Sequence, residues 1–180
     1  MDLKGPMFGI YYNLAFQPES TEFRFALETY AARGSTRYNS VGSGNLKNDL
    51  LGVFEGRLLG SYTITLKNNW IIEDYIGIGT RYLVNPKNSH LTTTGHSTYD
   101  RESHYYYIPI GIRIIKPLDN ELQFIAYVEY DNLLSGLQKI YLDIVTKNRQ
   151  PHGYVDRIGV DLYLPSSTYC LDYTMGVFAR

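Results

Sequence analysis

Apolar and polar residues alternate at every second position along almost the whole chain, which is the period of a β-strand with one face in an apolar environment. In one segment, for example, Tyr106, Ile108 and Ile110 alternate with Tyr107 and Gly111. The alternating segments cover residues 10–17, 22–28, 54–66, 72–82, 105–114, 121–131, 154–164 and 171–178. The pattern predicts an all-β chain of about eight strands.

The connections between these segments alternate in length. The short, turn-like connections are residues 17–21, 67–69, 117–120 and 165–168. The long, polar connections are residues 33–49, 85–102 and 132–153. Short and long connections in alternation predict an antiparallel up-and-down barrel in a single domain over residues 1–180. Within the last long connection, residues 137–145 fit either a strand extension or a short amphipathic helix.

The charged residues of the strands fall on the polar face. They are Glu22, Arg24, Glu28, Glu55, Arg57, Glu73, Arg81, Arg113, Glu129, Arg157, Asp161 and Asp172. A water-facing strand gains nothing from repeated glycine, yet Gly77, Gly79 and Gly111 lie on the same face. Arginine, carboxylate and glycine together suit a narrow interior in which opposite charges pair. We therefore expect a polar interior and a lipid-facing apolar exterior, the arrangement of a transmembrane β-barrel.

Aromatic residues mark both ends of the apolar face. Those at strand ends next to the long connections are Tyr82, Tyr106, Tyr130 and Tyr154, and those near the short turns are Phe16, Phe23 and Trp70. Two aromatic rings that bound an apolar band are typical of a lipid-water interface. A soluble, lipocalin-like lipid-binding barrel remains an alternative, in which the tyrosines rim a ligand cavity.

Composition excludes several classes of protein. The chain has 17 Lys plus Arg against 18 Asp plus Glu, so it lacks the basic field that binding to nucleic acid uses. Its single cysteine rules out a multi-cysteine metal site, and we expect neither a metal nor a cofactor. No apolar run reaches the roughly 18 residues of a membrane-spanning helix, and the first residues do not form a secretory signal.

Three segments carry a resemblance to a known family. They are Leu58-Leu59-Gly60-Ser61-Tyr62, the run DYIGIGTRYL at residues 74–83 and the run YDRESHYYYIPIG at residues 99–111. Glu129-Tyr130-Asp131, followed by Ser135-Gly136 and Gln138, is also similar to the same family. Over about residues 2–164 the chain resembles a family of Gram-negative outer-membrane β-barrel proteins, most of which are surface barrels without an assigned reaction. The resemblance implies an outer-membrane location, with contacts to outer-membrane lipids, lipopolysaccharide and the barrel-assembly machinery. It also implies a structural, adhesive or surface-binding role.

The number of connections departs from that family's pattern. Bacterial outer-membrane barrels keep short turns and both termini on the periplasmic side, whereas four short and three long connections would leave both ends outside. We therefore expect the chain to be a fragment. A strand missing at each end would give about ten strands in the intact barrel, with a signal peptide upstream.

Candidate chemistry is sparse. The histidines, His90, His96, His104 and His152, lie in or beside the long connections, and His104 is the candidate base if the chain is a lipid A-modifying or hydrolytic outer-membrane enzyme. The chain lacks Gly-x-Ser-x-Gly, His-Glu-x-x-His and phosphate-loop motifs, and we expect it not to be an enzyme. The aromatic residues around Arg101 fit either sugar or peptide stacking, or an interfacial girdle. The charged interior fits either a pore or a barrel filled by its own side chains.

Overall fold

The computed structural model describes the chain except for residues 1, 43, 88–90, 119–121, 143, 165–172 and 180. Its strands are β1 (Asp2–Lys4), β2 (Met7–Phe16), β3 (Phe23–Ser40), β4 (Gly44–Thr65), β5 (Ile71–Asn85), β6 (Asp100–Pro117), β7 (Gln123–Tyr141), β8 (Val145–Gln150), β9 (Tyr154–Leu164) and β10 (Tyr173–Ala179). A 3₁₀ turn, η1 (Lys67–Asn69), joins β4 to β5. The described residues include no helix long and apolar enough to span a membrane.

All the strands form one antiparallel sheet in the order β1-β3-β4-β5-β6-β7-β9-β10. β2 also pairs with β3, so β1 and β2 are one edge strand that is interrupted at Gly5 and Pro6. In the same way β8 and β9 both pair with β7, on either side of the break at residues 151–153. The sheet is therefore an up-and-down meander of eight strand paths, which confirms the predicted all-β fold.

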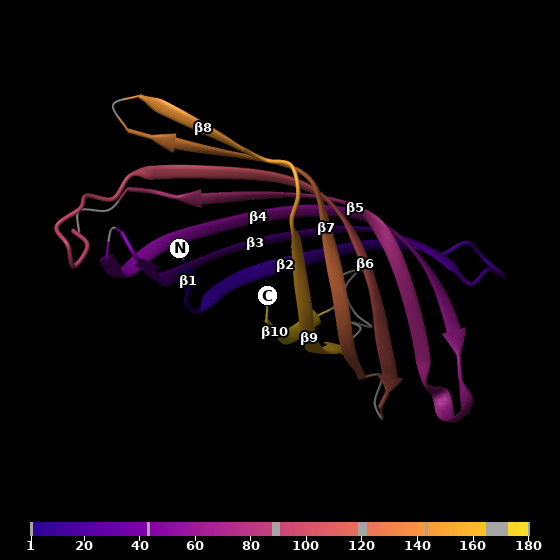
Figure 1. Ribbon diagram of the computed structural model, residues 1–180. Coiled ribbons are helices and arrows are strands. Elements are labelled where there is room, and N and C mark those ends of the chain that lie inside the picture. Colours follow the sequence, from indigo (N-terminus) through magenta and orange to yellow (C-terminus); the bar gives the residue numbers. More distant parts are fainter. Residues whose placement is uncertain are drawn as a thin grey trace.

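The sheet curls into a nearly closed barrel. In Figure 1, β9 and β10 come round to the side on which β1, β2 and β3 lie. The rings of Phe178 on β10 and Tyr30 on β3 meet edge to face, with their centroids 5.8 Å apart. No backbone ladder joins β2 to β10 within the described residues, so side chains bridge this seam.

Two of the long connections are strand rather than loop, and here the sequence prediction was wrong. Residues 33–40 continue β3, residues 44–49 begin β4, and residues 132–141 continue β7. Residues 137–141 follow the strand alternative, and they pair with both β6 and β8. The error has a physical reason: these segments extend beyond the apolar face, and inward side chains such as Thr36 and Asp49 are polar although buried, so the apolar alternation ends there. Figure 1 shows the β7–β8 hairpin projecting away from the barrel.

The faces of the sheet are inverted relative to a soluble protein. Outward residues such as Ile78 and Ile158 are 61% and 63% exposed, whereas the inward Glu28, Glu55 and Glu129 are 1%, 1% and 2% exposed. Successive side chains of a strand point to opposite faces, so the alternation in the sequence puts apolar side chains on the outward face and polar ones on the inward face. The core of the barrel is thus largely polar.

Candidate functional site

The charged interior is built from pairs of residues that face each other directly across neighbouring strands. These pairs are Glu28 with Arg57, Glu55 with Arg81, Glu73 with Arg113, and Glu129 with Arg157. Directly opposed side chains on one face of a sheet lie within contact distance, so the register alone brings each carboxylate to an arginine. The pattern repeats around the barrel from β3 to β9.

Contacts across the interior join these pairs into one continuous network. The Arg57 Nη1 atom lies 2.6 Å from Glu129 Oε2, and Arg57 also bonds Glu28. The Arg157 Nη2 atom lies 2.7 Å from Glu55 Oε1 and 3.3 Å from an Asp131 oxygen. Among the described residues the network has five arginines and five carboxylates: Arg24, Arg57, Arg81, Arg113, Arg157, Glu28, Glu55, Glu73, Glu129 and Asp131. The formal charges of the network therefore cancel.

Tyrosines complete the interior. Tyr107 faces Gly79 across the β5–β6 ladder, and Tyr75 faces Gly111. A Cβ atom at Gly79 would lie 2.4 Å from the Tyr107 ring, so the ring occupies the space above the glycine. Tyr127 over Gly159 repeats the arrangement on β7 and β9. This is the packing reason for the interior glycines.

The tyrosines also connect to the ion pairs. Arg81 lies over the Tyr107 ring at 4.7 Å from its centroid, and Arg113 lies over the Tyr75 ring at 4.4 Å. The Tyr75 hydroxyl donates to Glu129 at 2.8 Å, and the Tyr107 hydroxyl donates to Glu55. Each of the two rings therefore lies between a glycine and an arginine, with its hydroxyl on a carboxylate.

Most of the residues that the sequence placed inside are in this network, but not all. Glu22 is exposed in the turn before β3, where its backbone oxygen accepts from the Thr63 N–H at 2.9 Å, so its inclusion was wrong. Asp161 is half-buried on the inward face beside Gly176 and is not one of the ten network residues. Asp172 lies outside the described residues. The predicted interior set left out Asp131, although the alternation puts it on the polar face at the end of segment 121–131.

The predicted aromatic residues lie on the outward face. Tyr130 and Tyr154 stack with their centroids 5.9 Å apart, and Tyr82 meets His104 edge to face. The exposed members of the set are Phe16, Phe23, Trp70, Tyr106, Tyr130 and Tyr154. Lys116 lies over the Trp70 ring at 5.3 Å, which places a cation beside an aromatic ring at the short-turn end.

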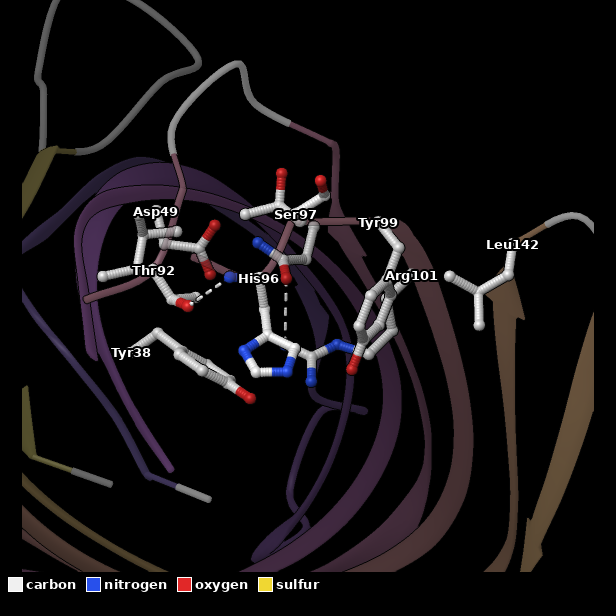
Figure 2. A pocket seen from close by; sticks show the side chains of 11 residues that line it. Tyr38, Asp49, Thr92, His96, Ser97, Tyr99, Arg101 and Leu142 are labelled. Carbon is white, nitrogen blue, oxygen red and sulfur yellow. Dashed lines mark hydrogen bonds between the residues drawn. The ribbon is translucent and has the colours of Figure 1, made fainter. Parts of the chain in front are cut away.

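A second region, the rim pocket, lies at the end of the barrel where the long connections are. Its cavity measures about 260 Å³, and its lining includes Tyr38, Asp49, Asn85, His96, Tyr99 and Arg101. Figure 2 shows Tyr38, Asp49, His96, Tyr99 and Arg101 converging on the cavity. The six lining residues come from β3, β4, β5, β6 and the connection before β6. Burial raises the pKa of the Asp49 carboxyl, and hydrogen bonding from Asn85 and the charge of Arg101 oppose this rise.

The histidines do not gather in one place. His96 lines the rim pocket, where its backbone N–H donates to Thr92 Oγ1 at 3.1 Å. The His104 ring lies 2.9 Å from Thr80 Oγ1 and contacts Tyr82 and Tyr106 on the outward face. His152 is exposed, and His90 lies outside the described residues. Among the side chains that the structure describes, no cluster of three or more His, Cys, Asp or Glu residues could hold a metal ion.

Comparisons of the chain with protein-family models, with curated proteins and with solved structures give no match. The resemblance of residues 58–62, 74–83 and 99–111 to outer-membrane barrels therefore stays a prediction. Support for a function comes from the geometry of the barrel.

Proposed function

We propose that the chain is a β-barrel of a Gram-negative outer membrane, with a structural, adhesive or surface-binding role and a filled interior. The observation that carries the proposal is the inversion of its faces: apolar side chains project outward, and the ion-pair network lies inside. Water around the barrel would meet a continuous apolar surface far larger than monomeric soluble proteins expose. Lipid around the barrel would solvate that surface favourably.

The height of the apolar face fits a bilayer. Its outward residues on β5 run from Ile72 to Tyr82 and are apolar apart from Asp74, near the short-turn end, and Thr80. About 11 residues at ~3.3 Å each, tilted by ~40°, span roughly 25 Å, which is the height of the apolar band of outer-membrane barrels. Aromatic residues at both ends of this band, such as Tyr130 and Trp70, fit the two interfaces.

The interior supports a filled barrel over the alternatives. A lipocalin-like carrier needs an apolar cavity, but the interior of the barrel holds Arg57, Glu129 and their neighbours in contact with one another. An eight-stranded barrel is just wide enough for its side chains to fill. For the enzyme alternative, the contacts of His104 are the outward Thr80, Tyr82 and Tyr106, and these lend no support to a role as a base.

Detergent dependence tests the proposal. The full chain is refolded from urea into zwitterionic micelles and, in parallel, into buffer without detergent. We expect a folded, monomeric protein only in micelles, with a gel mobility that changes when the sample is boiled. A monomer that is folded in plain buffer, with no such change in mobility, would contradict the membrane assignment.

A further inference from the structure

The rim pocket has a roof that is pinned to the barrel. The connection between β5 and β6 folds back on itself through a bridge between Leu91 and Ser97. It is then held to the start of β4, because the Thr93 N–H donates to the Asn45 oxygen and the Asn45 N–H donates to Thr93 Oγ1, both at 2.9 Å. The roof therefore has a defined place above the barrel mouth.

Gly44 permits this close approach. Its φ is +78°, and a Cβ atom there would lie 2.6 Å from Thr93 Oγ1. A larger residue would be strained in this backbone conformation and would push the roof away. The pocket is thus a built cavity between a fixed roof and the strand ends.

The floor of the pocket is polar, buried and neutral overall. Asp49, Asn85 and Arg101 are 4%, 7% and 6% exposed. The Arg101 Nη2 atom donates to Asn85 Oδ1 at 2.9 Å, and Asn85 hydrogen bonds Asp49, so one amide connects the two opposite charges. Hydroxyl groups of Thr92 and Ser97 add both donors and acceptors to the lining.

The walls are aromatic. Figure 2 shows Tyr38 and Tyr99 on opposite sides of the pocket, with His96 and Arg101 between them. A tyrosine ring presents an apolar face together with a polar hydroxyl, which suits a ligand that has apolar C–H faces and polar edges. A sugar ring has both features, and its hydroxyls donate and accept like the groups of the floor.

We infer that the rim pocket binds a single neutral sugar ring of about hexose size. The cancelling charges of Asp49 and Arg101 disfavour an ion. Leu46 and Leu142 make part of the lining apolar, and the buried polar groups beside them suit a ligand with both polar and apolar surface rather than a lipid chain. The volume of about 260 Å³ lies below the roughly 300–1,000 Å³ of pockets for drug-sized ligands, so one ring fits rather than a chain of rings. The inference rests on the proposed function, since the rim of a membrane-spanning barrel lies outside the lipid and is open to ligands in solution.

Saturation-transfer NMR tests the inference on the full chain, refolded in dodecylphosphocholine so that the detergent carries no sugar. The probes are glucose, galactose, mannose and N-acetylglucosamine, each added at up to millimolar excess. We expect transfer to at least one of them. Tyr99→Ala and Asp49→Asn should each weaken its binding about tenfold. The matched control is Tyr141→Ala, which removes a tyrosine at the same end of the barrel but outside the lining of the pocket.

Heat-dependent gel mobility verifies that each variant is folded before the comparison is made. Transfer to none of the four sugars, or transfer that persists unchanged in both pocket variants, would overturn the sugar site. Either result on a detergent-folded protein leaves the membrane proposal standing. A chain that folds without detergent contradicts the membrane proposal instead.

Discussion

Tyr107 and Gly79 face each other across the β5–β6 ladder, and the Tyr107 ring fills the space that a side chain at residue 79 would need. The same ring lies under Arg81 and donates its hydroxyl to Glu55. One glycine thus sets the position of a tyrosine that contacts both members of a cross-strand ion pair. Packing and charge pairing inside the barrel are therefore coupled at these positions.

Gly79→Ala should destabilise the barrel by about 1–3 kcal/mol, because the new methyl group overlaps the Tyr107 ring and the surrounding interior is tightly packed. Urea unfolding in micelles, followed by gel mobility, measures the change. The matched control is Gly56→Ala on the outward face, where the nearest atom to a Cβ is Thr80 Cγ2 at 4.0 Å. Equal losses at the two positions would show that the tyrosine contact is unimportant.

Arg57→Gln should cost about 3–5 kcal/mol of unfolding free energy, because it leaves Glu28 and Glu129 buried without their shared cation. The same urea titration measures it. Arg149→Gln, an exposed arginine on β8, serves as the control and should change stability by less than about 0.5 kcal/mol. If Arg57→Gln behaves like the control, the network does not stabilise the barrel.

The barrel should not conduct ions. Five arginines and five carboxylates contact one another across its interior, so ions have no continuous aqueous path. Planar bilayer recordings of the refolded chain, with membrane insertion verified by flotation of vesicles, should show no current steps above background. Sustained steps from the unmodified protein would mean that the interior is open.

The β7–β8 hairpin should be dispensable for folding. Gln138 and Asn148 are partners in its ladder, so Asn-Gly in place of residues 139–147 would close it with a two-residue turn. We expect the shortened chain to keep its heat-dependent mobility, because β8 is mostly exposed and pairs with β7 alone. The deleted residues 139–141 pair otherwise only with residues 100–102 at the start of β6. Failure of the shortened chain to fold in micelles would mean that the extension is part of the barrel's core.

Alternation was enough to predict the strands and their two faces, because a strand turns every second residue to the same side. It correctly placed Arg57, Glu129 and Arg157 inside and Ile78 outside. It failed for residues 33–40 and 132–141, which extend beyond the apolar face, so the apolar alternation ends there although backbone pairing continues.

Contacts that depend on register could not be predicted. Tyr75 and Gly111 are distant in the sequence, and only the pairing of β5 with β6 brings one over the other. The rim pocket could be predicted even less, because the residues of its floor and roof are far apart in the sequence and come from four strands and one connection. The sequence pattern pointed to Arg101 and the aromatic residues around it, but not to Asp49 or Asn85.

The position of the apolar face in lipid is the central claim, and fluorescence quenching tests it most directly. Trp70 is the single tryptophan of the chain, so Trp70→Phe provides a silent background. In that background Ile110→Trp puts a reporter in the middle of the outward apolar face, and Val41→Trp puts one at the tip of the β3–β4 hairpin. In vesicles of phosphatidylcholine brominated in the middle of its acyl chains, we predict strong quenching at residue 110 and little at residue 41. Equal, weak quenching of the two reporters would contradict a barrel that spans the membrane.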